Sequence, residues 1–253
     1  MSTSIQERLI RPARNISGSL RLPGDKSISH RYAMLGAFAE GVSRFTNFST
    51  GADCASTLAC MQALGAQVSH TGKDAVEIAG VGGRVTPGSA PLDCGNSGST
   101  MRMLSGLLAA QEGRFTLVGD DSLSRRPMER IRKPLEAMGA RLTLTGGHAP
   151  LTIEGARLNA IDYTTPVPSA QVKTCILLAG LQTGQTTTVR EAVRTRDHSE
   201  LALRAFGARL TRTADSVSIA GPQRLHAIEA AVPGDLSSAA FFLCAAAIFP
   251  GSG

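Results

Sequence analysis

The sequence predicts an α/β fold built from three copies of one unit, because two phrases of sequence recur in step and one of them is almost wholly apolar. The unit reads as a strand, a buried helix, a second strand, a second helix and a hairpin. Repeated units of this kind bury a common core between neighbouring copies. The composition suits such a fold, since 42% of the 253 residues are hydrophobic and 18% are charged, as in ordinary globular proteins.

The apolar phrase predicts a helix that is buried on every side. Each copy begins with small polar residues, continues almost without a charge and ends at a glycine. The three copies are Ser29–Gly41, Ser99–Gly113 and Ala170–Gly184. A helix without a polar face has to be surrounded by protein. A strand follows each glycine, at Val42–Phe48, Arg114–Val118 and Gln185–Arg190.

The other phrase predicts the end of the second helix and the strand behind it. Its copies are Met61–Val68, Leu135–Leu142 and Leu203–Leu210, with glycines spaced 74 and 68 residues apart. An amphipathic pattern that stops at glycine is typical of a helix C-terminus, because glycine adopts the left-handed conformation there. Short hairpin strands such as Val76–Ala79 and Leu151–Glu154 complete the unit.

A fourth buried-helix phrase begins near the end of the sequence, at Val232–Gly251. It has no second helix or strands after it, so its apolar surface lacks a predicted sheet to pack on. We therefore expect residues 22–232 to form a complete three-repeat domain. Residues 1–21 and 233–253 would be incomplete pieces of a second domain, the chain being the N-terminal part of a longer protein. The alternative is that residues 233–253 form a capping helix.

The charge favours a small anionic ligand. The formal net charge is +6, and the basic residues are 22 arginines and four lysines. Arginine suits planar, bidentate binding of carboxylate and phosphate. A nucleic acid would also match the charge, but the sequence has no lysine-rich run, zinc-finger spacing or aromatic platform. We therefore predict a small-molecule partner and no nucleic acid.

The remaining composition predicts a cytoplasmic protein without a membrane segment. The five cysteines form no C-x-x-C pair, which indicates reduced thiols. The N-terminus lacks the apolar stretch of a signal peptide. The longest apolar run, Ala239–Pro250, is shorter than the roughly 18 residues of a membrane-spanning candidate.

The polar starts of the three buried helices form the candidate site. Each start carries one cation near its first turn, namely Arg31, Arg102 and Lys173. A helix N-terminus has free N–H groups and a partial positive charge, so a further cation is unfavourable there unless an anion is bound. Three cations in register therefore predict an anion site, whereas serine capping alone would explain any single helix.

Further basic residues accompany these starts. Lys26 precedes Ser27 in a glycine-containing turn, and a partly desolvated lysine can hold an anion or donate a proton; Asp25 beside it could pair with it. Arg125 and Arg126 are predicted to open the second helix of unit two, with Pro127 in its first turn. Arg194 and Arg196 hold the matching place in unit three.

No motif points to a metal or a cofactor. The histidines lack metal-ligand spacing, no nucleophile triad is recognisable, and no dinucleotide fingerprint follows a strand. His30 and His198 are expected to cap helices or line the pocket rather than to activate a nucleophile.

Together these motifs resemble the enolpyruvyl transferase family, and within it the enzymes that act on shikimate 3-phosphate. The motifs stand in family order at Leu22–Arg31, Gly95–Arg102, Ser124–Met128, Pro168–Lys173, Thr195–Ser199 and Pro233–Ser238. The resemblance implies transfer of the enolpyruvyl group of phosphoenolpyruvate to the 5-hydroxyl of shikimate 3-phosphate, with release of phosphate. This reaction belongs to the shikimate pathway, which leads to chorismate and the aromatic amino acids, and it uses no cofactor.

The resemblance also implies an architecture. It predicts two domains, each an inverse α/β barrel of three strand-helix-strand-helix-hairpin repeats with helices buried in the centre, and substrates bound in the cleft between them. The second domain would supply an aspartate, a glutamate and further basic contacts that this sequence does not contain. The chain alone is therefore expected to be inactive, and the complete enzyme to be a monomer that needs the missing C-terminal domain.

Site residues follow from the resemblance, residue by residue. Lys26 is the expected catalytic residue and a contact to both substrates. Shikimate 3-phosphate would be held by Lys26, Ser27, Arg31, Ser169, Gln171 and Arg196. Phosphoenolpyruvate would face Lys26, Asn96, Gly98, Arg126 and Gln171. Glyphosate would inhibit by taking the phosphoenolpyruvate place.

Two other functions stay open. One is a non-catalytic anion-binding fragment. The other is the sister enzyme that acts on UDP-N-acetylglucosamine, which would need a Lys-Asn pair at the first helix and a reactive cysteine in the loop of unit two. Here the pair is Lys26-Ser27, and residues 119–128 contain no cysteine.

Overall fold

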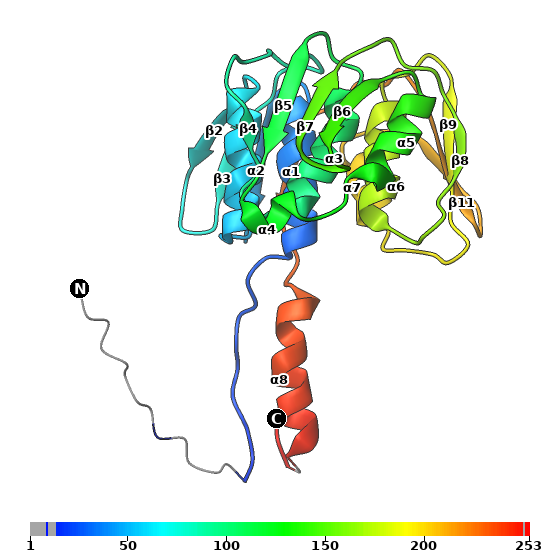
Figure 1. The fold of residues 1–253 in the computed structure, drawn as a ribbon. Coiled ribbons are helices and arrows are strands. Elements are labelled where there is room, and N and C mark those ends of the chain that lie inside the picture. Colours follow the sequence, from blue (N-terminus) through cyan, green and yellow to red (C-terminus); the bar gives the residue numbers. More distant parts are fainter. Residues whose placement is uncertain (1–8, 10–13, 250) are drawn as a thin grey trace.

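The computed structural model describes residue 9 and residues 14–249 and 251–253, and its strands form three four-stranded sheets packed around helices (Figure 1). The first unit contains α1 (Lys26–Phe38), β1 (Val42–Thr46), α2 (Ala52–Ala63), β2 (Gln67–His70) and β3 (Val76–Ala79). The second contains β4 (Leu92–Asp93), α3 (Gly98–Leu108), β5 (Arg114–Val118), α4 (Asp121–Ser124), α5 (Glu129–Ala137), β6 (Arg141–Thr145) and β7 (His148–Glu154). The third contains β8 (Asp162–Thr164), α6 (Ala170–Gly180), β9 (Thr186–Arg190), α7 (His198–Ala205), β10 (Leu210–Arg212) and β11 (Ser216–Ala220). The strand β12 (Glu229–Ala231) and the helix α8 (Leu236–Ile248) follow.

The three sheets share one strand order. A short edge strand pairs in parallel with the strand after the buried helix, and that strand pairs antiparallel with the hairpin. The orders are β4-β5-β7-β6, β8-β9-β11-β10 and β12-β1-β3-β2. The shared order confirms the predicted α/β repeats.

The edge strand of the first sheet comes from the far end of the repeats. β12 takes there the place that β4 and β8 take in the other sheets, with Glu229 opposite Arg44 of β1. This pairing joins the third unit to the first. Hydrogen bonding does not continue from one sheet to the next among the described strands, so the wall of the predicted barrel consists of three separate open sheets.

The helices α1, α3 and α6 lie inside, as predicted from their lack of a polar face. In α6 every residue from Val172 to Gly180 is buried. The backbones of α3 and α6 touch, because a Cβ added at Gly106 would lie only 1.9 Å from the carbonyl oxygen of Cys175. Small residues at such crossings let helices approach more closely than larger side chains allow.

Polar side chains cap the starts of all three inner helices. Asp25 accepts a hydrogen bond from the N–H of Ile28 at 2.8 Å. Ser97 and Ser169 accept in the same way from residues three positions further on, at 3.1 and 3.4 Å. Each cap satisfies an N–H group that has no partner within the helix.

Glycines end the second helices where the repeated phrase predicts. Gly65, Gly139 and Gly207 have φ values of +105°, +102° and +90°. Each lies two residues after the end of α2, α5 or α7, in the left-handed region that other residues rarely adopt.

The inner helices end three to five residues before the predicted glycines, at Phe38, Leu108 and Gly180. The carbonyl groups at these ends accept hydrogen bonds from the loops that follow the hairpins. Ala156, for example, donates to Ala109 at 3.0 Å, and Gln223 donates to Leu181 at 3.0 Å. Tertiary contacts therefore terminate these helices before the sequence signal does.

The predicted start of the second helix in unit two was wrong. Residues 125–128 connect α4 to α5, and Pro127 lies outside both helices. The side chain of Asp120 caps the short helix α4 by accepting from Leu123 at 2.8 Å. The main helix begins only at Glu129, so the two arginines stand on a bend.

The cysteines agree with the prediction of reduced thiols. All five are free, and four of them are buried. Burial raises the pKa of the Cys54 thiol to about 11, so it stays protonated at neutral pH. Within the part of the chain that the structure describes, no helix combines the length and the apolar content needed to cross a membrane.

The helix α8 extends away from the sheets, alongside the segment that leads to α1 (Figure 1). Of its residues only Ala239 is buried, whereas Phe241 is 81% exposed and Ile248 is 72% exposed. Backbone bonds from Gly18 to Gly253 and from Gly253 to Ile16, at 2.9 and 3.0 Å, join the two segments.

Candidate active site

The starts of the three inner helices meet at one end of the domain. Gln171, in the first turn of α6, donates to the Ser99 hydroxyl of α3 at 2.9 Å and accepts from Arg102 of α3 at 2.9 Å. Arg31 of α1 donates to the Thr174 hydroxyl of α6 at 3.0 Å. These side-chain bonds bring the predicted residues of separate repeats together.

Gly98 lies beneath two guanidinium groups. A Cβ added there would lie 2.9 Å from Nη1 of Arg102 and 3.4 Å from Nη1 of Arg126. The same glycine opens α3, whose first N–H groups point out of the helix. Two guanidinium groups over a helix N-terminus can hold a small carboxylate or phosphate by charge and by directed donors.

The loop before α3 holds Arg126 in this position. Arg126 donates to the backbone carbonyl of Asn96 at 3.2 Å and to its side-chain oxygen. Asn96 donates in turn to Asp120 at 2.7 Å. The bend between α4 and α5 therefore points one of its two arginines toward Gly98.

Arg102 received no substrate role from the sequence, although it was one of the three cations in register. The structure places it between Gly98 and Gln171 and lets it donate to the carbonyl of Pro127 at 3.2 Å. Burial lowers the pKa of Arg102, and the charges of Arg126 and Arg130 lower it further. Concentrated positive charge of this kind favours an anionic ligand.

Lys26 lies at the exposed edge of the end of the domain where the three helix starts meet. Its side chain is 51% exposed, and its ammonium group lies 3.1 Å from Asp53 of α2. Asp25 caps α1 and does not pair with Lys26, contrary to the suggestion from the sequence. An exposed ion pair contributes at most about 1 kcal/mol, so Lys26 is free to exchange Asp53 for a ligand.

Arg31 is buried among polar groups that accept its hydrogen bonds. Its guanidinium donates to the Ser199 hydroxyl at 2.7 Å, to the Ser27 carbonyl at 2.7 Å and to Thr174 at 3.0 Å. Burial lowers the pKa of Arg31 to about 10, partly opposed by the Glu200 and Asp25 carboxylates, so it remains charged at neutral pH. Guanidinium N–H groups are left over for a further acceptor.

Three predicted residues line the same region with fewer contacts. Ser27 contributes its carbonyl to Arg31, and the Ser169 hydroxyl caps α6. Arg196 is exposed. Its charge is one of the causes that lower the pKa of Arg31, which places the two guanidinium groups near each other.

Lys173, the third cation in register, does not face the others. It is fully buried, and its ammonium group lies 2.8 Å from a Glu191 oxygen and 2.8 Å from a Glu200 oxygen. The prediction of three cations around one anion was therefore wrong at this residue. Sequence register gives the distance along a helix, but the side chain turns toward partners contributed by other segments.

A buried chain of hydroxyl groups connects the starts of α1 and α3. Nδ1 of His30 lies 2.7 Å from the Thr57 hydroxyl, which lies 2.6 Å from that of Thr100, and Thr100 donates to the α3 cap, Ser97, at 2.7 Å. Burial lowers the pKa of His30 to about 4, so the ring is neutral. The sequence predicted a pocket-lining or capping role for His30 but gave no sign of this chain.

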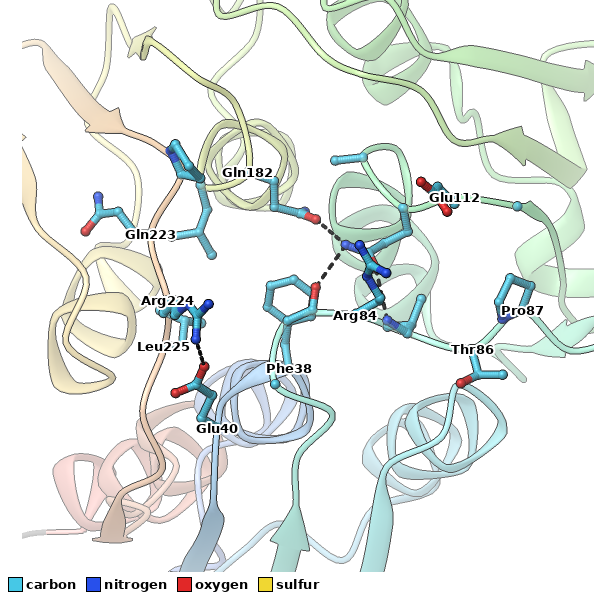
Figure 2. A pocket seen from close by; sticks show the side chains of 18 residues that line it. Phe38, Glu40, Arg84, Thr86, Pro87, Glu112, Gln182, Gln223, Arg224 and Leu225 are labelled. Carbon is cyan, nitrogen blue, oxygen red and sulfur yellow. Dashed lines mark hydrogen bonds and ion pairs between the residues drawn. The ribbon is translucent and has the colours of Figure 1, made fainter.

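A cavity of about 960 Å³ lies at the opposite ends of the inner helices (Figure 2). None of the predicted site residues lines it. Gln111 donates to Gln182 at 2.5 Å and to the carbonyl of Gly83 at 3.3 Å, which ties these ends together. Arg224 is paired with Glu40 at 2.6 Å, as Figure 2 shows. Helix C-termini carry partial negative charge, so this end is less favourable to an anion than the end that holds the predicted residues.

Comparisons with known proteins agree with the repeats and the motifs. The chain matches the family model of EPSP synthase (3-phosphoshikimate 1-carboxyvinyltransferase) over residues 10–252. It is 61% identical over 243 residues to the 3-phosphoshikimate 1-carboxyvinyltransferase of Koribacter versatilis and 54% identical over 248 residues to that of Solibacter usitatus. These alignments cover 96% and 97% of this chain, and 57% and 58% of the relatives.

A solved structure shares the fold. EPSP synthase from Acinetobacter baumannii superposes with a TM-score of 0.88 at 44% sequence identity, over 94% of this chain and 54% of that one. The chain thus spans a little over half the length of the relatives it matches.

Proposed function

The chain belongs to the EPSP synthase family, and from this membership we propose that it is the N-terminal portion of a transferase of the shikimate pathway. The enzyme moves the enolpyruvyl group of phosphoenolpyruvate to the 5-hydroxyl of shikimate 3-phosphate and releases phosphate. The observation that carries the proposal is the pair of guanidinium groups over Gly98, of which Arg102 also donates to Gln171 in the first turn of α6. The family's place in aromatic amino acid synthesis further suggests a cytoplasmic enzyme.

Phosphoenolpyruvate binds in the half of the site around Gly98. Its carboxylate and phosphate are planar or tetrahedral anions that match the forks of arginine. Arg126 and the first N–H groups of α3 supply donors there, and Asn96 fixes the position of Arg126. Arg102 joins this half as a contact that the sequence did not assign. Glyphosate, an anion of similar size, competes for the same place.

Shikimate 3-phosphate binds in the half between α1 and α6. Lys26 and Arg196 stand exposed at its opening, where they can meet a phosphate. Ser27 and Ser169 are partly buried there. Arg31 is charged, and its uncommitted N–H groups face acceptors from the ligand. Gln171 lies on the border of the two halves.

The reaction begins with protonation of the methylene carbon of the enol, while the 5-hydroxyl attacks the neighbouring carbon and loses its proton to give a tetrahedral ketal. It ends when the C–O bond to phosphate breaks and a proton leaves the new methyl group, which restores the double bond, so that the hydroxyl proton leaves with phosphate overall. The guanidinium groups over Gly98 stabilise the negative charge of the departing phosphate, which is electrostatic stabilisation by donors already in place. Lys26 exchanges Asp53 for substrate and moves a proton at the opening of the site.

We propose the same domain organisation as the sequence predicts. Residues 22–232 form the three-repeat domain, and residues 1–21 and 233–253 belong to a second domain. The exposed apolar residues of α8 support this, since they would pack against further strands of that domain. The complete enzyme is proposed to act as a monomer.

Calorimetric titration and a mixing experiment test the function. The chain is titrated with shikimate 3-phosphate, with and without phosphoenolpyruvate, and then mixed with the C-terminal portion of the Koribacter versatilis relative. We expect binding by the chain alone, no phosphate release, and release after mixing. Binding without release in the mixture would indicate a non-catalytic module. Tighter binding of UDP-N-acetylglucosamine than of shikimate 3-phosphate would contradict the proposed acceptor.

A further inference from the structure

Lys173 forms a buried ion cluster beside the acceptor half of the site. It is fully buried on α6 and lies 2.8 Å from Glu191, which follows β9, and 2.8 Å from Glu200, in the first turn of α7. Glu191 also accepts from the Thr195 hydroxyl. The cluster therefore connects three separate segments of unit three.

Stability alone does not account for this cluster. Removing charges from water costs several kcal/mol per ion, and apolar replacements are often neutral or stabilising. Moreover, neither carboxylate oxygen of Glu200 accepts a hydrogen bond of good geometry among the described residues, although Lys173 lies close. Because the Glu200 carboxylate is buried with a charged neighbour but without a hydrogen bond of good geometry from the described residues, its presence needs a reason other than stability.

The explanation lies in the neighbours of the ion pair. Thr174 follows Lys173 in α6, and Ser199 precedes Glu200 in α7. Both neighbouring hydroxyls accept hydrogen bonds from Arg31, at 3.0 and 2.7 Å. The Lys173–Glu200 pair thus holds together the two helices whose hydroxyls orient the guanidinium.

We propose that Lys173 and Glu200 are positioning residues for shikimate 3-phosphate, acting through Arg31. Their ion pair keeps the first turn of α7 against α6, so that Ser199 and Thr174 aim the Arg31 guanidinium into the acceptor half. The ligand in this statement rests on the proposed function above, whereas the orientation of Arg31 does not.

The first measurement observes Arg31 without any ligand. In isotopically labelled protein, the arginine Nε–Hε resonances are recorded by NMR for the wild type and for Glu200→Gln. Glu136→Gln is the matched control, because Glu136 is a partly exposed partner of Arg132 on α5, away from Arg31. The Arg31 resonance, assigned through Arg31→Lys, should shift or broaden in Glu200→Gln and stay in place in Glu136→Gln. An unchanged Arg31 resonance in Glu200→Gln would overturn the proposal.

The second measurement is a double-mutant cycle on affinity for shikimate 3-phosphate. Glu200→Gln should weaken binding about tenfold, the scale of one charge-assisted contact. In an Arg31→Ala background it should change binding by less than about twofold, because residues that act through each other are not additive. An equal loss in both backgrounds would mean that Glu200 acts independently of Arg31.

The two measurements separate the inference from the function. If the Arg31 resonance moves but no variant binds shikimate 3-phosphate, the positioning stands and the proposed acceptor fails. If Glu200→Gln does not fold, Glu200→Asp takes its place, since it keeps the charge and shortens the reach by one methylene. The same shift of the Arg31 resonance is then expected.

Discussion

Gly98 sets the space beneath the guanidinium groups of Arg102 and Arg126 in the proposed site. Alanine at this position would bring a methyl carbon within 2.9 Å of a terminal nitrogen of Arg102, which is the flexible end of a long side chain. The guanidinium would yield by a small displacement, and the helix would keep its backbone. We therefore expect the substitution to alter the proposed anion site without unfolding the protein.

In a complete enzyme carrying this portion, Gly98→Ala should raise the inhibition constant of glyphosate more than the Michaelis constant of phosphoenolpyruvate. Phosphoenolpyruvate has one fewer atom than glyphosate between its carboxyl carbon and its phosphorus, so it is the shorter ligand and loses less room to the methyl group. Steady-state kinetics of both variants measure the two constants. Equal factors for both would show that Gly98 does not discriminate between the ligands.

Arg31→Ala should remove a charge-assisted contact to shikimate 3-phosphate worth about 1.5–3 kcal/mol, or roughly a ten- to hundredfold loss of affinity. Arg141→Ala, an exposed change on β6, is the control. Calorimetry with the acceptor alone gives both dissociation constants. Unchanged binding by Arg31→Ala would remove this residue from the site.

His30 should make the protein sensitive to acid. Burial lowers its pKa from 6.5 to about 4 in the folded protein. Between these values the unfolded chain binds a proton that the folded one does not, so stability falls as the pH is lowered through this range and this contribution levels off below it. The loss amounts to about 3 kcal/mol, because one pKa unit corresponds to about 1.4 kcal/mol.

The measurement compares the free energy of unfolding of wild type and His30→Asn between pH 7 and pH 4 by urea titration. The other titrating groups are common to both proteins, so the difference between the two curves isolates His30. We expect this difference to shrink toward acid pH. Parallel curves would mean that His30 keeps its ordinary pKa in the folded protein.

At the scale of elements, the close crossing of α3 and α6 depends on Gly106, which has no side chain. Gly106→Ala would place a Cβ 1.9 Å from the Cys175 carbonyl oxygen, a backbone atom that has to move with its helix. Such overpacking costs about 1–3 kcal/mol or more. Because both helices carry site residues, ligand affinity should fall as well.

Gly184→Ala is the matched control for this substitution. Nothing lies within 4 Å of a Cβ built there, and its φ is outside the left-handed region. Its effect should stay within about 0.5 kcal/mol, as for surface changes. Denaturant midpoints of the two variants test the contrast, and similar midpoints would show that the helices separate without cost.

At the scale of the whole molecule, α8 carries large apolar side chains that the described residues leave exposed. Phe241, Leu236 and Ile248 are 81%, 72% and 72% exposed. Exposed apolar surface of this kind promotes association. We expect the 253-residue chain to bind a hydrophobic dye and to self-associate as its concentration rises, as followed by light scattering.

Phe241→Asp should reduce both dye binding and association, whereas Val193→Asp should not, although Val193 is also 63% exposed. Val193 lies outside α8, between β9 and α7. Equal effects of the two substitutions would place the association surface elsewhere. Addition of the C-terminal portion of a relative should likewise suppress dye binding if α8 belongs to a second domain.

The sequence by itself determined the repeated unit, the burial of three helices and their approximate ends. These features depend on local chemistry: apolar residues all around a helix, a polar cap at its start and a glycine that tolerates positive φ. Gly65, Gly139 and Gly207 occupy the positions that this chemistry requires. Gly98, Gln171 and Arg126 were named through the family resemblance of their motifs, and the structure brings all three to Arg102 or Gly98.

Only the tertiary structure decided which side chains meet. It placed β12 beside β1, turned Lys173 toward Glu191 and Glu200, and brought Arg102 over Gly98. Each of these contacts joins residues from different segments, and its energy depends on distance and burial in space. Periodicity along the chain specifies which face of a helix is apolar, but a charged residue on a buried helix takes its direction from partners that the fold supplies.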